Sequence, residues 1–153
     1  MLKKWKNKKL LKNEKGLTLV ELLAVIVILA IIAAIAVPAI GNIINKSKDR
    51  AILAEASNIL SGAKIAYIDG ACKAVADECS SSELDPFVDG IKLDGTKVTF
   101  KDDTWTITYP NLNKMKTNLK PSSTTINESD LNARLKDAGV ESPKGEGGEG
   151  GGK

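Results

Sequence analysis

The feature that most constrains this chain is the apolar run from Leu22 to Ile40, nineteen residues with no charged side chain and a single proline. At a rise of ~1.5 Å per residue, a helix of this length covers ~28 Å, close to the thickness of the hydrocarbon layer of a membrane. A lone carboxylate, Glu21, stands at the start of the run. Because a carboxylate inside a membrane costs at least ~2.5–3.5 kcal/mol, Glu21 is expected to have a partner and a function.

The segment before this run is strongly basic. Residues 1–16 carry seven of the 22 basic residues of the chain and one of its 19 acidic residues. Cations on one flank of a membrane helix predict a cytoplasmic N-terminus, with the later part of the chain outside. The rest of the chain is slightly acidic, so no direct binding of nucleic acid is expected.

The sequence contains no histidine and two cysteines, Cys72 and Cys79. Without histidine there is no Cys–His zinc cluster and no Ser–His or Cys–His catalytic pair, so neither an enzyme nor a cofactor is indicated. An even number of cysteines beyond the apolar run fits an oxidising exterior. A Cys72–Cys79 disulfide would need a loop or reversed turn, because residues seven apart in a helix lie ~10.5 Å apart along its axis. Two free thiols are the alternative.

A single helix is expected to continue past the apolar run to about Tyr67, with Gly70 at its end. Pro38 predicts a kink near Ala34–Pro38. The simplest interpretation of this proline is an ordinary kink of a membrane helix with no special role, because such helices tolerate proline. Beyond Ile43 the apolar residues recur at helical spacing and fall on one face: Ile52, Leu53, Ala56, Ile59, Leu60, Ala63, Ala66 and Tyr67. This predicts a helix of roughly fifty residues that is half membrane span and half core element.

The second half of the chain predicts a small antiparallel sheet and a short helix. Segments 90–93, 97–100 and 104–109 are the expected strands, with Asp94-Gly95 as a hairpin turn. Asn127 to Gly139 has the cap and glycine stop of a short helix. The aspartates at 85, 89, 94, 102 and 103 lack full EF-hand spacing, so no metal site is predicted. The fold class is therefore α+β, with the long helix packed on the sheet.

The order of residues around Glu21 resembles the N-terminus of type IV pilins and pseudopilins. The resemblance covers about thirty residues. It begins with Glu14–Leu23 (EKGLTLVELL) and continues through the apolar run to its end at Ala33–Ala39 (AAIAVPA). It implies that a prepilin peptidase cuts between Gly16 and Leu17 and then methylates the new amine of Leu17, a position where the family usually has phenylalanine. It also implies that Glu21 pairs with the terminal amine of a neighbouring subunit during assembly.

The resemblance further implies a structural subunit that polymerises with copies of itself into a type IV pilus. Its partners would be the peptidase and methylase, the inner-membrane assembly machinery, and the membrane before assembly. The subunit would be a single-pass membrane protein with a cytoplasmic N-terminus, and would become extracellular in the filament. The expected parts are a removed leader at 1–16, a hydrophobic helix at 17–44, a globular head at 45–140, and a disordered tail at 141–153.

Several alternatives remain open at this point. A pseudopilin of a type II secretion or competence DNA-uptake system would share the same N-terminus. A secretory signal peptide cleaved after Ala34-Ile35-Ala36 would remove the apolar run. A plain membrane anchor would leave Glu21 as a residue that reaches toward water. A membrane-anchored enzyme or binding module would come from a different class of protein.

Overall fold

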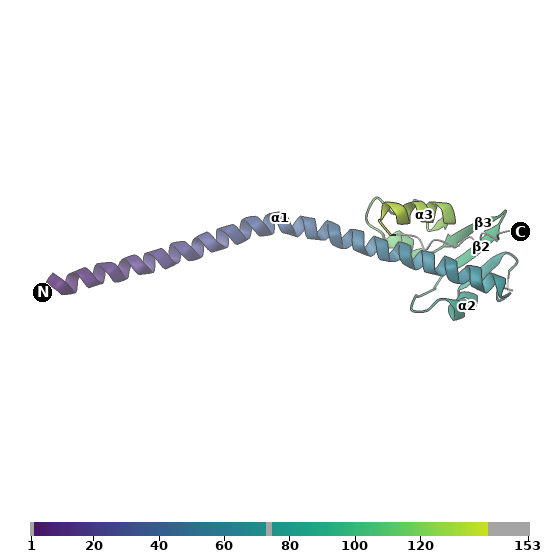
Figure 1. The fold of residues 1–153 in the computed structure, drawn as a ribbon, viewed down its shortest axis with the longest axis horizontal. Helices are drawn as coiled ribbons and strands as arrows, with labels where there is room; N and C mark the ends of the chain where they lie inside the picture. Colours follow the sequence, from purple (N-terminus) through teal and green to yellow (C-terminus); the bar gives the residue numbers. More distant parts are fainter. Residues whose placement is uncertain (1, 73–74, 141–153) are drawn as a thin grey trace, which may run out of the picture. The chain divides into compact units, whose positions relative to one another are not determined.

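The computed structural model describes residues 2–72 and 75–140 (Figure 1). Its internal contacts divide the chain into one unit that ends at Ile43 and another that begins at Ile44. A long helix comes first, followed by a four-stranded antiparallel sheet with short helical turns between its strands, and then a C-terminal helix. This is the pilin-like α+β architecture that the sequence predicts. The expected tail at 141–153 lies outside the described residues.

Helix α1 runs from Leu2 to Ile68 and includes Pro38. It starts within the basic segment, so that segment and the apolar run belong to one helix. In the first unit nearly every side chain from Thr18 to Ile43 is exposed, and Ala36 is half-buried. Within the described residues, α1 is the helix that is long and apolar enough to cross a membrane. The kink expected near Pro38 stays a prediction.

In the second unit α1 supplies one side of the hydrophobic core. The predicted apolar face is confirmed, because Leu53, Ala56, Ile59, Leu60, Ala63 and Ala66 are all buried. Ile52 packs partly against the core, while Tyr67 at the end of this face is 36% exposed. The helix ends at Ile68, and the expected glycine stop, Gly70, follows it with a φ of 72°. The amide of Ala71 donates to the Ala66 carbonyl at 2.9 Å, which closes the last turn.

The sheet has the order β1-β2-β3-β4, with every neighbouring pair antiparallel. Its strands are β1 (Glu78–Ser80), β2 (Lys97–Lys101), β3 (Thr104–Thr108) and β4 (Thr125–Asn127). Strands β2 and β3 form a hairpin in which Lys101 pairs with Thr104. The two turn residues, Asp102 and Asp103, have φ values of 50° and 60°. A two-residue turn of this kind needs positive φ, which aspartate tolerates better than most residues.

Two parts of the sequence-based prediction of the sheet were wrong. Segment 90–93 is not a strand, and β1 pairs with β2 instead. Asp94 and Gly95 form a turn that leads into β2, closed by a 2.8 Å hydrogen bond from the Thr96 amide to the Leu93 carbonyl, but not a hairpin. Strand β4, which ends at the predicted helix cap Asn127, was not among the expected strands.

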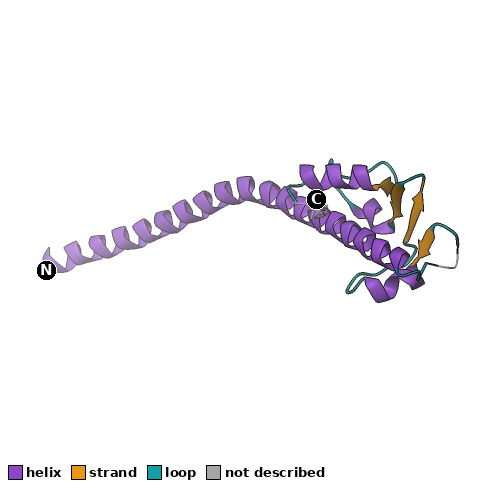
Figure 2. Ribbon diagram, turned by 45° about the vertical axis from the view of Figure 1, so that its right-hand side comes forward, coloured by secondary structure: helices purple, strands orange, loops and turns teal. Residues whose placement is uncertain are grey.

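The remaining elements are short and close the core (Figure 2). Helix α2 covers Ser81–Leu84, the 3-10 turns η1 and η2 cover Asp85–Phe87 and Pro110–Lys114, and helix α3 covers Glu128–Asp137. The predicted cap and stop of α3 are confirmed: the Asn127 side chain accepts from the Asp130 amide, and Gly139 has a φ of 72°. The largest side chains enclosed between α1, the sheet and α3 are Leu53, Ile59, Leu84, Val98, Ile107, Tyr109, Leu112, Leu131 and Leu135.

Candidate functional site

The candidate processing and assembly segment lies within α1. Gly16 and Leu17 are in helical conformation, and the following residues from Thr18 to Glu21 are exposed. The apolar neighbours of Glu21 are open as well, with Leu19 69% and Leu22 64% exposed. The carboxylate of Glu21 is therefore set in an apolar surface that has no covering element in the described chain.

This arrangement leaves Glu21 available to another molecule. Among the side chains that the structure describes, Glu21 has no ion pair or hydrogen bond. An apolar helix in lipid or in a helix bundle excludes water, so a charge on it is stabilised by an opposite charge brought by a partner. An α-amino group is a suitable partner, because it is cationic near neutral pH.

Residues 11–37 match the family model described as the prokaryotic N-terminal methylation motif. This motif is the signature of type IV pilins and pseudopilins, which are structural subunits and not typically enzymes. The match includes Gly16, Leu17, Glu21 and the apolar helix up to Val37. Comparison of the chain with curated proteins and with solved structures gave no match. The chain thus carries the pilin and pseudopilin signature on its first helix. The match does not extend to the second unit, from Ile44 onward, which we call the head.

The two cysteines form a disulfide in the head, as the sequence analysis expected. Their Cα atoms are 4.7 Å apart, because α1 has ended and the chain has turned back before Cys79. Cys79 is buried in β1, where it pairs with Val98 of β2. The bridge therefore ties the segment that follows α1 to the edge strand of the sheet.

Two polar contacts that the sequence analysis missed connect α1 to distant parts of the head. The Tyr109 hydroxyl donates to Glu55 Oε2 at 2.5 Å and accepts from Asn111 Nδ2 at 2.8 Å. Asp49, which is 1% exposed, accepts from the amides of Lys116 and Thr117. No local pattern could have revealed these pairs, since 54 and 67 or more residues separate the partners.

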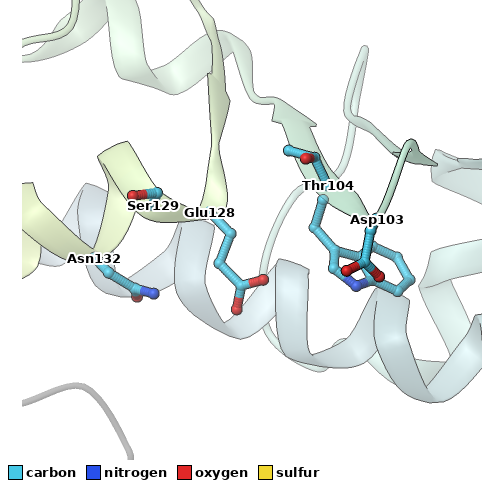
Figure 3. Close-up of a pocket in the computed structure, with 6 residues that line it drawn as sticks. Asp103, Thr104, Glu128, Ser129 and Asn132 are labelled. Atoms are coloured by element: carbon cyan, nitrogen blue, oxygen red, sulfur yellow. The ribbon is translucent and has the colours of Figure 1, made fainter.

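A shallow pocket of about 400 Å³ lies between the β2–β3 turn and the start of α3 (Figure 3). Its lining residues are Asp103, Thr104, Trp105, Glu128, Ser129 and Asn132. Two of them are engaged within the chain. Lys64 forms an ion pair with Glu128 and lies 5.9 Å from the Trp105 ring centroid, while Phe100 lies 4.6 Å from that ring. We therefore assign this pocket no ligand. Within residues 2–72 and 75–140 there is no group of three potential metal ligands.

Proposed function

We propose that this chain is a pilin that is cut between Gly16 and Leu17, methylated on the Leu17 amine, and polymerised into a type IV pilus on the cell surface. Before assembly it is a single-pass membrane protein with its N-terminus in the cytoplasm. Its partners are the prepilin peptidase and methylase, the assembly machinery of the inner membrane, and other copies of itself.

The observation that carries this proposal is the exposed apolar surface around Glu21 on the first unit. The side chains from Leu22 to Ile40 are apolar on all sides of the helix, and all of them except Ala36 are exposed within the described chain. A helix that is hydrophobic all round requires lipid or other apolar helices around it. A bundle of the same helix from many copies provides those neighbours, and it transfers the segment from membrane to filament without exposing it to water.

The charge of Glu21 gives the bundle its register. A plain anchor gains nothing from a carboxylate at this position, whereas a bundle can match it with the Leu17 amine of a neighbouring copy. Two charges removed from water bind well only when they meet each other, so the pair selects one axial stagger of the helices. Removing one member of such a pair costs about 3–5 kcal/mol, a factor of hundreds or more for each added subunit.

The test replaces Glu21 by alanine and measures filaments in sheared surface fractions by electron microscopy, with membrane-bound subunit quantified in parallel. We expect normal insertion and normal cleavage after Gly16, with filaments strongly reduced. Glu21→Asp is the matched control that keeps the charge, and Glu21→Gln keeps the size without it. We expect partial assembly with aspartate and failure with glutamine.

Filaments at the wild-type level from Glu21→Ala would show that the charge pair does not direct assembly. Loss of membrane insertion in the same variant would place the role of Glu21 before assembly. A pseudopilin would share the processing and the membrane span. It differs in its product, because the surface fraction would contain no long filaments of this chain even with Glu21 intact.

A further inference from the structure

The buried carboxylate of Asp49 fixes a loop of the head against α1. It accepts from the Thr117 amide at 2.7 Å, from the Thr117 hydroxyl at 2.6 Å and from the Lys116 amide at 3.1 Å. Met115 and Leu119, on either side of these contacts, are buried in the core. The segment from Lys114 to Lys120 therefore has a defined place beside the α1 turn that contains Asp49.

This arrangement gathers cations from three separate parts of the sequence. Lys48 and Arg50 are the chain neighbours of Asp49 in α1, and Lys46 lies one turn earlier. The end of α3 lies here too, because a Cβ added at Gly139 would be 3.6 Å from Arg50 Nη2. All of these cations are exposed. The loop contributes Lys114, Lys116 and Lys120, and the last turn of α3 contributes Lys136. We call the whole set the basic face, which consists of Lys46, Lys48, Arg50, Lys114, Lys116, Lys120 and Lys136.

Little negative charge offsets the basic face. Within the described residues, none of its members forms an ion pair. Lys120 Nζ donates instead to the Asn113 carbonyl at 2.8 Å. Among the described residues, the acids next to its members in the sequence are Asp49, which is buried, and Asp137 at the end of α3, which is exposed. The face therefore carries a clear excess of positive charge.

Acidic side chains gather at the other end of the head. Asp69 follows the last turn of α1, and Asp77 accepts through its carbonyl from the Phe100 amide in β2. Asp102 and Asp103 form the neighbouring hairpin turn. Twenty residues of helix separate Asp49 from Asp69, which corresponds to ~30 Å. The basic face is thus a separate feature at the Asp49 end of the head.

We propose that the basic face docks on anionic lipid headgroups of the membrane that α1 spans. The position of the face in the sequence supports this, because Lys46 follows Ile43, the last residue of the first unit, by three residues. Three residues of chain span at most ~10 Å even when fully extended, so this cation stays within reach of the headgroups. Clustered lysines near a membrane span bind anionic surfaces strongly, and the attraction fades within about 10 Å at 0.1 M salt.

The proposal rests on the membrane span of the proposed function and is independent of filament assembly. It assigns Asp49 a positioning role, since this carboxylate brings the loop lysines to the same level as those of α1. Docking would hold the head at the surface of the membrane until the subunit is extracted. The acidic end of a second copy is the competing occupant of the same face.

The test uses the full chain embedded singly in lipid nanodiscs, with either phosphatidylglycerol or phosphatidylcholine as the lipid. A water-soluble amine-acylating ester modifies exposed lysines, and mass spectrometry gives the rate at each position. Lys114, Lys116 and Lys136 report on the basic face, and Lys92 and Lys101 are exposed lysines elsewhere on the head. We expect at least threefold slower modification of the first group relative to the second in phosphatidylglycerol, reversed by 0.5 M salt. Both shielding and the negative surface potential slow acylation, and both require nearness to the lipid.

Equal relative rates in the two lipids would overturn the proposal. Slowing that appears only with two copies in one disc, whatever the lipid, would assign the face to a second copy instead. As a further test, the double variant Lys114→Glu/Lys116→Glu should lose most of the slowing at Lys136. The matched double variant Lys92→Glu/Lys101→Glu should keep it. If the first variant does not fold, the proposal is still decided by the relative modification rates of the natural chain in the two lipids. Failure of filament assembly in the Glu21 experiment would leave this result unaffected.

Discussion

The Tyr109 hydroxyl joins the end of β3 to α1 through a short contact with Glu55. Burial is the main cause that raises the pKa of Tyr109 to about 12, and the hydrogen bond to Glu55 adds to it, while Asn111 acts in the opposite direction. A raised pKa means that the folded head holds the phenolic proton more tightly than the unfolded chain, whose tyrosine titrates near 10. The neutral hydroxyl is therefore part of what stabilises the head.

This single residue predicts a loss of stability in alkali. Because the folded pKa is raised, the contribution is fully present below pH 10 and is lost as the pH rises from about 10 to about 12. Tyr109→Phe should flatten that part of the profile, since phenylalanine has no proton to lose. Tyr67→Phe is the control, because it removes a hydroxyl at the exposed end of α1. Unfolding in urea at a series of pH values gives the free energy of unfolding as a function of pH for each variant and for the natural chain. Identical profiles for Tyr109→Phe and the natural chain would contradict this assignment.

The roles proposed for Gly16, Leu17 and Glu21 were drawn from the sequence and stay predictions, whereas the contacts of Tyr109 and Asp49 could not be drawn from it. Gly16, Leu17 and Glu21 lie in one short sequence motif, so their proposed roles depend on residues that are close in the chain. Asp49 depends on Thr117, which is 68 residues away, and nothing beside Asp49 in the sequence shows that it is buried. Tertiary pairing of this kind becomes visible only in the folded chain.

At the scale of elements, α1 and the chain at η1 lie close together at Gly62. A Cβ added at Gly62 would lie 2.5 Å from Val88 Cγ2 and 2.8 Å from the Phe87 carbonyl oxygen. The second neighbour is backbone, so the η1 segment would have to move. The missing side chain of Gly62 is thus what allows Val88 to reach the core.

Gly62→Ala should therefore destabilise the head despite the better helix propensity of alanine. Overpacking costs about 1–3 kcal/mol, and the propensity gain returns about 1 kcal/mol. We expect the free energy of unfolding to fall by up to about 2 kcal/mol, measured by thermal or urea unfolding of the full chain in detergent. Gly41→Ala is the matched control, because nothing lies within 4 Å of a Cβ at that helical position. Equal stability of the Gly62 variant and the natural chain would show that the η1 segment can shift without a loss of stability.

The long elements were predicted well because each carries its own pattern. The apolar face of α1, the alternation in β2 and β3, and the cap and stop of α3 are all local signals. Strands β1 and β4 have three residues each, too few to show an alternation. Strand β1 has its place because the disulfide and the pairing of Cys79 with Val98 bring it beside β2. Segment 90–93 carried apolar residues, but Leu93 is buried in a turn that leads into β2.

At the scale of the whole molecule, the chain combines two units with different requirements. Among the described residues, none before Ile44 belongs to the hydrophobic core, and the exposed apolar helix there requires lipid or other helices around it. The unit from Ile44 has a core closed by a disulfide. This division fits the boundary expected between hydrophobic helix and head near residue 44, which stays a prediction for the assembled protein. We infer that the helix provides the assembly contacts and the head provides the surface of the filament.

The most direct measurement of the central claim is the intact mass of this chain in sheared surface filaments. The account predicts a polypeptide that starts at Leu17, carries one methyl group on its terminal amine, and retains the apolar helix. Fragmentation should place the methyl group on Leu17, and the mass before reduction should be two hydrogens lower, as the Cys72–Cys79 bridge requires. A chain that starts at Val37, or one that still begins at Met1 in the filament, would contradict the account.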